Sequence, residues 1–309
     1  MIEFEGQVVV VTGAGRGMGR LHALELAARG ARVVVNDLGG TMGGDGADAK
    51  VADDVVEEIR AGGGTALASY DSVATPEGGA AIVDTALDSF GRLDAVVSNA
   101  GILHTAPFDE LTVDDWRRML RVHLDGAFYL SQPAYRAMKA GGGGRFVFIA
   151  SSAGFFGQPS SAHYAAAKAG TMGLANVIAI EGAEHGILAN CVLPFGYSRM
   201  VWELAGERDE LEPEPGFLHA IEPELVVPMV VYLASRSCQL THHSFSACAG
   251  RYARAFAGLG TGWVADTPSP TIDDIAEHLE QIASPDPYTI PGSIIDEVLQ
   301  VCEQLQIGA

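Results

Sequence analysis

The chain alternates between short apolar runs and longer segments with the periodicity of an amphipathic helix. The first two runs, at residues 7–12 and 32–36, are rich in valine and are separated by a helical segment that ends at Gly30. Continuous runs of β-branched residues are typical of strands buried on both faces of a parallel sheet. Further strands are expected at residues 65–69, 93–98, 146–150, 188–193 and 244–248. The pattern therefore predicts an α/β protein with a seven-stranded sheet.

Helical periodicity fills the intervals between these strands. Helices are expected at residues 49–61, 76–90, 115–140, from 162 onward and at 223–235. Residues 251–309 follow the last expected strand as a C-terminal extension, with helices near Thr271 and at residues 294–305. We expect one domain at residues 1–250, and an extension that packs on the same domain or on a neighbouring subunit.

A glycine-rich turn joins the first strand to the first helix. Its candidate coenzyme contacts are Gly13, Gly15, Arg16, Gly17, Met18 and Gly19. Glycines allow the backbone to approach a pyrophosphate closely, and free N–H groups at the start of the helix favour its negative charge. Because the chain contains 38 glycines, the motif gains weight only from the strand before it and the helix after it. Together they predict a dinucleotide-binding domain.

Asp37 follows the second strand directly. A carboxylate there can accept hydrogen bonds from the adenosine ribose and would repel a 2′-phosphate, which favours NAD over NADP as the cofactor. Arg16 argues the other way, because a cation in the turn could assist a 2′-phosphate. The carboxylate is given more weight because it would lie on the ribose itself. Asp37 could also be an ordinary turn residue before two glycines.

Other strands end in residues that would lie at the same edge of the sheet. Asp71 is a candidate adenine contact, and Asn99, Ala100 and Gly101 are small enough to let the backbone approach a ribose or a nicotinamide. Each of them could instead serve only to turn the chain. The remaining candidate coenzyme contacts are Ser72, Pro194, Gly196 and Ser198.

The segment from Ser151 to Lys168 carries the candidate proton chemistry. In a helix that starts near Ala162, Tyr164 and Lys168 stand one turn apart on the same face. At roughly 4 Å and an effective dielectric of about 20, the ammonium would stabilise the phenolate by about 4 kcal/mol, which lowers the pKa of the tyrosine by roughly three units. Tyr164 could then act as a base near neutral pH. The alternative is a surface ion pair without a catalytic role.

The charge and the hydropathy of the chain exclude several kinds of partner. The formal net charge is −20, and no basic cluster offsets it, so neither nucleic acid nor an anionic membrane surface is expected as a partner. No apolar run reaches membrane-spanning length, and no basic region precedes the first apolar run. A cytoplasmic protein without membrane insertion is expected.

Two further segments have alternative interpretations. The acidic residues between 203 and 214 could form a solvated loop or a mobile lid over a substrate. Cys238, His242, His243 and Cys248 fit no common zinc spacing, so no metal site is expected.

The motifs occur together in an order that resembles the short-chain dehydrogenase/reductase family over roughly residues 6–250. They are Thr12-Gly13-x-x-x-Gly17-x-Gly19, Asn99-Ala100-Gly101, Ser151 and Tyr164-x-x-x-Lys168. The resemblance implies a doubly wound parallel sheet of the Rossmann kind. It also implies that Ser151 polarises a carbonyl, that Tyr164 acts as acid and base, and that Lys168 tunes Tyr164 and holds the nicotinamide ribose.

His123 is a further catalytic candidate from this resemblance. Many family members have asparagine at this position, where the main-chain carbonyl holds a relay water. Because a backbone atom does that work, histidine at position 123 need not abolish it. A histidine inside such a long helix is, however, more often structural than catalytic.

A narrower resemblance links the chain to the (3R)-hydroxyacyl-CoA dehydrogenase unit of multifunctional β-oxidation enzymes. It is carried by stretches such as VVVVTGAGRGMGR, VVVNDLGG and RVHLDGAF. It implies an NAD-dependent dehydrogenase of a lipid-like 3-hydroxyacyl-CoA, with a steroid or other bulky apolar alcohol as the alternative substrate. The C-terminal QIGA differs from a peroxisomal S-K-L signal, which favours a free-standing cytoplasmic enzyme.

The resemblance also bears on assembly and on an alternative class of function. Members of the family commonly associate through their long helices, so a homodimer or a homotetramer is expected. A catalytically idle protein that senses NAD is the alternative from another class. The intact set of Ser151, Tyr164 and Lys168 argues against it.

Overall fold

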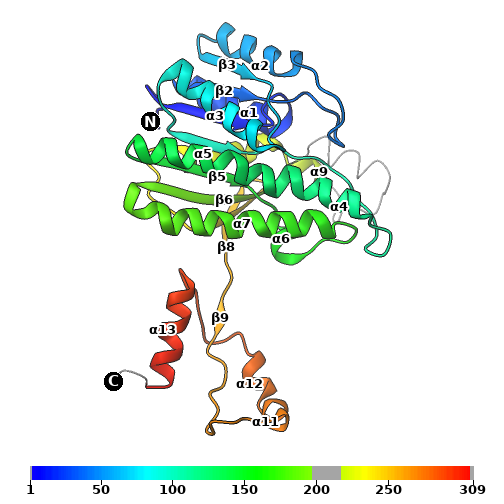
Figure 1. The fold of residues 1–309 in the computed structure, drawn as a ribbon, viewed down its shortest axis with the longest axis vertical. Coiled ribbons are helices and arrows are strands. Elements are labelled where there is room, and N and C mark those ends of the chain that lie inside the picture. The colour runs from blue at the N-terminus through cyan, green and yellow to red at the C-terminus, as the bar shows by residue number, and fades with distance from the viewer. Residues whose placement is uncertain (1, 197–216, 307–309) are drawn as a thin grey trace. The chain divides into compact units, whose positions relative to one another are not determined.

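The computed structural model describes residues 2–196 and 217–306. It divides the chain into two compact units, Met1–Arg254 and Ala255–Ala309, and each is described by itself. The first unit is built on one sheet with the strand order β3-β2-β1-β4-β5-β6-β7-β8 (Figure 1). Its strands are β1 (Val8–Thr12), β2 (Arg32–Asn36), β3 (Thr65–Ser69), β4 (Ala95–Ser98), β5 (Gly144–Ile149), β6 (Ile187–Phe195), β7 (His243–Cys248) and β8 (Arg251–Ala255).

The strands from β3 to β7 are all parallel, as the valine-rich runs predict. Strand order reverses at β1, which pairs with β2 on one side and with β4 on the other. At such a reversal the connections leave in opposite directions, so a crevice opens at the carboxyl ends of β1 and β4. The doubly wound fold expected from the sequence is therefore confirmed.

The predicted count of seven strands is wrong, because β8 adds an eighth. Its sequence, RYARA, lacks the apolar run that marks the other strands, so the sequence assigned these residues to the extension. Ala249 and Gly250 join it to β7, and both have positive φ, 51° and 77°. A two-residue connection with that backbone geometry is the tight turn of an antiparallel hairpin.

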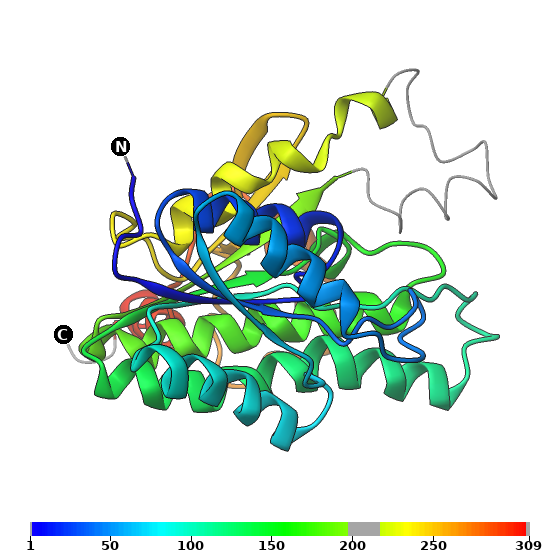
Figure 2. The same ribbon diagram turned by 90° about the horizontal axis from the view of Figure 1, so that it is seen from above.

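Two layers of helices cover the sheet. α3, α5 and α7 lie on one face, and α1, α2 and α10 lie on the other (Figure 2). The helices of this unit are α1 (Gly17–Ala28), α2 (Lys50–Ala61), α3 (Pro76–Phe90), α4 (Val113–Leu120), α5 (Gly126–Ala140), α6 (Ala153–Phe156), α7 (Ala162–Gly182), α9 (Phe217–Ala220) and α10 (Val227–Ala234). Short 3-10 turns lie at Ala183–His185 and Pro223–Leu225.

The single helix predicted at residues 115–140 is three segments in the structure. A π-helical turn, η1 (Arg121–Asp125), separates α4 from α5. Hydrophobic periodicity does not distinguish a π-helical turn from an α-helical one over five residues, so the sequence could not reveal it. Such turns interrupt helices frequently at functional sites, and this one carries His123.

The core of the first unit is formed by the sheet and the helices packed on it. The side chains of Val9 and Val11 in β1 and of Val33 and Val35 in β2 are completely buried. They pack with apolar residues of α1, α2 and α10 in one cluster. This rigid centre fixes the strand ends from which the candidate site residues emerge.

The second unit is a small arrangement of short elements. β9 (Leu259–Gly260) pairs antiparallel with β10 (Tyr288–Thr289), and three helices accompany them, α11 (Ile272–Glu277), α12 (Leu279–Ala283) and α13 (Ile294–Gln304). Thr271 and Asp274 form the capping box at the start of α11, where the sequence predicts a helix. None of its described residues, 255–306, is buried.

Across the described ranges of both units, no helix is long and apolar enough to cross a membrane.

Candidate active site

The glycine turn lies between β1 and α1, with the backbone packed too tightly for side chains. Gly13 has a φ of 62°, and a Cβ added to it would lie 2.8 Å from the Cα of Ala100. A Cβ on Gly19 would lie 2.1 Å from the carbonyl oxygen of Gly13. Both distances are shorter than real Cβ contacts, so only glycine fits these two positions.

Asp37 lies at the carboxyl end of β2 and is tied to this turn. Its Oδ2 accepts a hydrogen bond of 2.8 Å from the N–H of Gly15, and its Oδ1 accepts one of 2.7 Å from the N–H of Gly39. The carboxylate therefore organises the glycine turn, a role that the sequence does not reveal. Its contact with a ribose stays a prediction.

The next loop closes the opposite side of the crevice. The side-chain amide of Asn99 donates to the carbonyl oxygens of Thr12, at 2.9 Å, and Gly13, at 3.1 Å. The hydroxyl of Thr12 accepts in turn from the N–H groups of Asn99, at 3.0 Å, and Ala100, at 3.1 Å. Thr12 is therefore a site residue that the predicted set omits. The feature of the sequence that could have identified Thr12 is its position between the first strand and the first glycine of the turn.

The turn and the start of α1 are suited to a dinucleotide. Arg16 is the N-cap of α1, its side chain forms no cap hydrogen bond, and the first turn contains no acidic residue. The N–H groups at this helix start are thus not satisfied by a side-chain cap, which favours an anion such as a pyrophosphate. The residues that would hold the coenzyme are the turn glycines, Asp37 and the loop at Asn99.

The other predicted coenzyme contacts lie near this crevice, with one exception. Gly196 is buried close to Met18, because a Cβ on it would lie 3.2 Å from the sulfur of Met18. Pro194 precedes it near the end of β6. Asp71 follows β3, and its Oδ2 accepts a hydrogen bond from Ser69 at 3.2 Å. The hydroxyl of Ser72 accepts a hydrogen bond of 3.2 Å from the N–H of Ala74. The exception is Ser198, which lies outside the described residues, as does the predicted lid at 203–214.

The fold brings Ser151, Tyr164 and Lys168 together. Ser151 follows β5, and the other two lie in the first two turns of α7. A side-chain hydrogen bond connects Ser151 with Tyr164. The ammonium of Lys168 is buried, donates to the carbonyl of Ile149 at 2.6 Å, and lies 5.7 Å from the centre of the Tyr164 ring. The three side chains form one cluster at the carboxyl edge of the sheet.

The expected acidification of Tyr164 by Lys168 is wrong for this state of the protein. Burial raises the pKa of Tyr164 above its usual value, and the hydrogen bond with Ser151 offsets this only partly. The pKa that falls is that of Lys168, which burial lowers to about 8. The predicted shift holds for a solvated pair, whereas both groups lose water here and the ammonium of Lys168 donates to the carbonyl of Ile149.

His123 contacts the tyrosine from the side of η1. Its ring is perpendicular to the Tyr164 ring, with the centroids 5.3 Å apart. Its Nε2 lies 3.0 Å from the N–H and 2.9 Å from the carbonyl of Ile102, and burial holds its pKa well below the usual value. A Cβ on Gly101 would meet this ring at 2.5 Å, so the glycine makes room for the imidazole. The neutral ring thus positions both Tyr164 and the loop.

The main-chain carbonyl of His123 is engaged as well. It accepts a hydrogen bond of 3.3 Å from the hydroxyl of Thr171, which also donates to Ala167 at 2.9 Å. Thr171 is a second residue that the predicted set omits. The buried Cys191 lies near Lys168, and burial raises the pKa of its thiol to about 12, so the thiol is neutral and does not pair with the ammonium.

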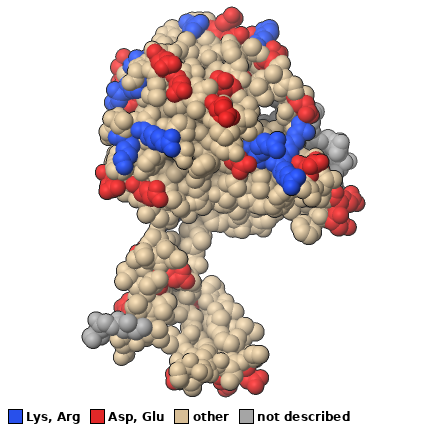
Figure 3. All heavy atoms as spheres, viewed as in Figure 1, with Lys and Arg blue, Asp and Glu red and all other residues tan. Residues whose placement is uncertain are grey.

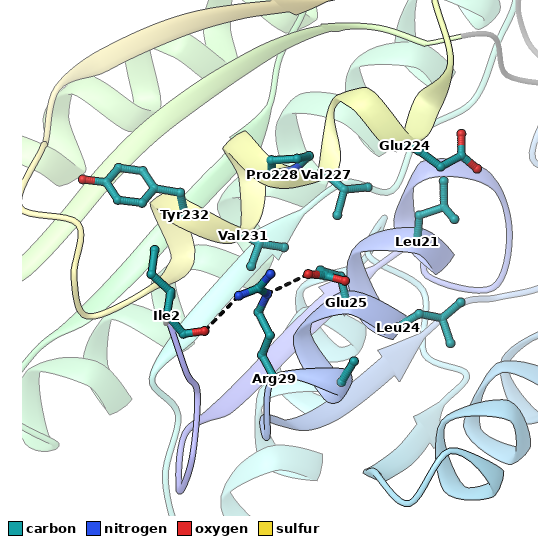
Figure 4. A pocket seen from close by; sticks show the side chains of 11 residues that line it. Ile2, Leu21, Leu24, Glu25, Arg29, Glu224, Val227, Pro228, Val231 and Tyr232 are labelled. Carbon is teal, nitrogen blue, oxygen red and sulfur yellow. Dashed lines mark hydrogen bonds and ion pairs between the residues drawn. The ribbon is translucent and has the colours of Figure 1, made fainter. Parts of the chain in front are cut away.

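A groove elsewhere on the first unit is separate from this cluster. It has a volume of about 560 Å³ and lies between α1 and α10 (Figure 4). Arg29 crosses it, donating to Glu25 at 2.6 Å and to the carbonyl of Ile2 at 3.0 Å. Within the described part of the chain, its lining includes none of the predicted site residues. Over the same residues, no group of three His, Cys, Asp or Glu side chains could hold a metal ion.

The cluster, the crevice and the fold together define the class of protein. The family model described as short chain dehydrogenase matches residues 7–203, and the chain belongs to this family. It is therefore an oxidoreductase of a family that uses nicotinamide coenzymes.

Individual relatives give a closer comparison. A short-chain type dehydrogenase/reductase of Mycobacterium tuberculosis is 42% identical over 278 residues, which are 90% of this chain and 94% of the relative. Peroxisomal multifunctional enzyme type 2 of Mus musculus is 44% identical over 249 residues, 81% of this chain and 32% of that enzyme. This chain thus spans about a third of the mouse enzyme. The recognised similarity to the multifunctional enzymes is confirmed.

Solved structures agree with this comparison. The full-length peroxisomal multifunctional enzyme type 2 from Drosophila melanogaster matches 99% of this chain and 50% of its own, with 32% identity and a TM-score of 0.81. A 7α-hydroxysteroid dehydrogenase complexed with NADH and 7-oxo glycochenodeoxycholic acid matches 80% of this chain and 95% of its own, with 26% identity and a TM-score of 0.72.

Proposed function

We propose that this chain is an NAD-dependent dehydrogenase that interconverts a secondary alcohol and a ketone. The observation that carries the proposal is the cluster in which Tyr164 contacts Ser151 and His123 and lies beside Lys168. In the direction of oxidation, Tyr164 in its phenolate form takes the proton of the substrate hydroxyl and becomes a neutral phenol, and Ser151 donates a hydrogen bond to the same substrate oxygen as charge develops. The nicotinamide coenzyme, when bound, accepts the hydride.

The choice of NAD rests on the charges around the glycine turn. Arg16, Arg20 and Lys50 are the cations that line the small cavity beside it. Each is already engaged: Arg16 with the carbonyl of Gly40, Arg20 with Glu58, and Lys50 with Asp54. Arg20 and Lys50 are therefore paired with carboxylates, whereas Arg16 keeps its charge, and a 2′-phosphate would lie against the carboxylate of Asp37, which accepts from the N–H of Gly15 within the turn. This arrangement supports NAD and disfavours NADP.

Replacement of Asp37 tests this choice. The variant Asp37→Ala is expected to lower kcat/KM for NAD and to narrow the gap between NAD and NADP by about 10- to 100-fold, equivalent to about 1–3 kcal/mol. Part of the loss with NAD would come from the glycine turn, which loses its partner at Gly15. Steady-state kinetics with both coenzymes measure the gap, and Asp88→Ala on the exposed side of α3 is the control. Equal efficiency of the wild type with both coenzymes would contradict the assignment.

For the substrate we propose a (3R)-hydroxyacyl-CoA, on the strength of the narrower resemblance and the similarity to multifunctional enzymes. A hydroxysteroid or other bulky apolar alcohol is the second candidate, since a structural relative of similar fold is a 7α-hydroxysteroid dehydrogenase. The net charge of −20 opposes a phosphate-bearing substrate unless arginines lie locally. On the face of the first unit seen in Figure 3, cations lie in separate groups beside carboxylates. Arg251 and Arg254 on β8 are exposed candidates, and Arg199 and Arg208 lie outside the described residues.

The two substrates are separated by a rate comparison with NAD. We expect turnover of the (3R) enantiomer of a medium-chain 3-hydroxyacyl-CoA, slower turnover of the (3S) enantiomer, and little activity on a 17β-hydroxysteroid. Because CoA carries phosphate charges, kcat/KM for the thioester should also depend on salt concentration. Activity on the steroid alone would exclude the acyl-CoA and leave the dehydrogenase proposal standing.

The extension supports a proposal about assembly. Apolar side chains of α13 are exposed, among them Ile294, Ile295, Val298 and Leu299. An apolar stripe of this extent marks an interaction surface. We propose that it is covered in the homodimer or homotetramer expected from the sequence. Light scattering at micromolar concentration should give a multiple of 32.3 kDa, and Leu299→Glu should weaken the assembly. A wild-type monomer would contradict this.

The expected cytoplasmic location stays a prediction. The names of the mouse and fly relatives include the word peroxisomal, which points to another compartment for those proteins. Fluorescence microscopy of the tagged full-length chain in its own host would decide between the two.

A further inference from the structure

Two histidine rings meet beside the proposed catalytic tyrosine. His163 precedes Tyr164 in the first turn of α7 and is completely buried. Its Nε2 lies 3.1 Å from the Nδ1 of His104, and the two rings are nearly perpendicular, at 87°. His104 belongs to the β4–α4 loop, which is residues 99–112 between β4 and α4. A single ring-to-ring hydrogen bond thus connects this loop to α7.

A carboxylate on α4 determines the direction of this hydrogen bond. Oδ1 of Asp115 lies 3.8 Å from the Nε2 of His104, and Asp115 is itself held by the hydroxyl of Thr112. A carboxylate favours a proton on the nitrogen that faces it, so the proton of neutral His104 belongs on Nε2. Its Nδ1 then accepts from the Nε2–H of His163. The buried Nδ1 of His163 becomes a lone pair, for which the described residues offer no partner.

The hydrogen bond is one of three that fasten the β4–α4 loop around Tyr164. Nε2 of His123 lies within hydrogen-bond distance of both the N–H and the carbonyl of Ile102 and bonds one of them, according to its tautomer. The N–H of Ala106 donates to the carbonyl of Ser160 at 2.9 Å. His123 touches the ring of Tyr164, and His163 is its neighbour in the chain. The loop is therefore bound on both sides of the tyrosine.

We infer that His104 and His163 are positioning residues, whose hydrogen bond locks the β4–α4 loop to the first turn of α7 and so holds the hydroxyl of Tyr164 in its reactive place. This inference rests on the proposed dehydrogenase function. A displacement of about 1 Å at a reacting group can cost two orders of magnitude in rate, so a lock beside it affects turnover directly.

The hydrogen bond between His104 and His163 depends on the protonation of the two rings and is weakened at acid pH. The hydrogen bond is lost when each ring carries a proton on both nitrogens, because Nδ1 of His104 and Nε2 of His163 are then both donors. The titratable groups that act on His163 are His104 on the loop, Asp115 on α4 and His123 on η1. Burial and His104 lower the pKa of His163, while Asp115 raises it, and the net direction is down. The lock is therefore intact above about pH 6.5 and is lost as the pH falls through the lowered value.

The test measures ketone reduction between pH 5 and 8, where Tyr164 stays protonated because its pKa is raised. His163→Phe fills the space without the hydrogen bond and should lower kcat about two- to tenfold, the range expected for one neutral hydrogen bond. The Kd for NADH should not change. His163→Gln can donate to His104 but does not titrate, so it should recover most of kcat and lose the acid limb. His104→Phe should match His163→Phe, and the double variant should lose no more than either.

His185→Phe, on the turn after α7, is the control and should behave as the wild type. A wild-type kcat with an unchanged acid limb in His163→Phe would overturn the inference, as would losses that multiply in the double variant. A wild type that reduces no ketone refutes the proposed function instead. In that case ¹⁵N NMR of the histidines still tests the lock: the His163 signals should report one protonated nitrogen, Nε2, and should shift in His104→Phe. An unshifted His163 would overturn it.

Discussion

Replacing Tyr164 with phenylalanine is expected to lower kcat for alcohol oxidation by about 10²- to 10⁴-fold, the contribution typical of a positioned general base. The substitution removes one oxygen and keeps the ring that packs against His123. Ser151 can donate to the substrate oxygen, but it cannot replace the lost base. Lys168 cannot either, since its ammonium is directed at the carbonyl of Ile149. The Kd for NAD should therefore stay close to that of the wild type.

The pH profile adds a second test of the same residue. Because burial raises the pKa of Tyr164, the phenolate becomes more populated as the pH rises, and wild-type oxidation should accelerate from neutral to alkaline pH. Tyr164→Phe should lose this rise. Tyr135→Phe is the matched control, because the Tyr135 hydroxyl on α5 donates to the carbonyl of Glu181 at 3.0 Å and Tyr135 is not one of the candidate site residues. If Tyr164→Phe retained turnover within a few-fold of the wild type, the catalytic assignment would be wrong.

Replacing Asp94 with alanine is expected to lower the free energy of unfolding by about 2–4 kcal/mol. This nearly buried carboxylate accepts from the N–H of Val8 at 2.9 Å and from Arg92 at 2.6 Å and Arg236 at 2.8 Å. It therefore joins the start of β1 to the start of β4 and to the segment after α10. The variant leaves the N–H of Val8 without its acceptor in the core. Urea denaturation at neutral pH measures the loss, with the exposed Asp84→Ala as the control.

The same carboxylate sets an acid limit to the stability. Burial alone would raise the pKa of Asp94, but the hydrogen bonds from Arg92, Val8 and Arg236 outweigh it and lower the pKa below its usual value. A depressed carboxyl pKa contributes stability that is fully present above about pH 4 and is lost as the pH falls through the folded-state value. The difference between wild type and Asp94→Ala should therefore shrink below pH 4. A constant difference down to pH 2 would refute the linkage.

The sequence predicted those elements whose local signals agree with their burial. β2 and β3 have the expected bounds, because each is a short run of strand-forming residues between turns; β2 is buried, and β3 is the partly exposed edge strand. α3 also has them, since Thr75 caps it, Pro76 opens it and Gly91 ends it in the left-handed region. β8 was not predicted because its residues form no apolar run, and only its pairing with β7 makes it a strand. The π-helical turn was not predicted because the helical period of apolar residues continues through it.

The candidate site was predictable wherever one residue type at one place carries the chemistry. The glycines, Asp37 and the Ser151, Tyr164 and Lys168 set follow strand ends or share a helix face, so their placement came from the pattern. Their partners could not be found in this way. Thr12 and Asn99 are 87 positions apart, and His104 and His163 are 59 apart, so only the folded chain brings them together. The pKa of Tyr164 depends on water lost on folding, which sequence spacing does not describe.

The reversal of strand order at β1 has a consequence for synthesis on the ribosome. β1 can pair with β2 as soon as Asn36 has emerged, but its other edge stays unpaired until β4 follows, at Ala95. Once the loop at Asn99 has followed, the part of the proposed coenzyme site that β1, β2 and β4 form is in place, before Ser151, Tyr164 and Lys168 have been translated. Because N-terminal segments fold first during synthesis, the nascent chain assembles its binding half ahead of its reacting half. Coenzyme present in the cell can therefore bind and stabilise the growing chain before the proposed catalytic residues have been synthesised.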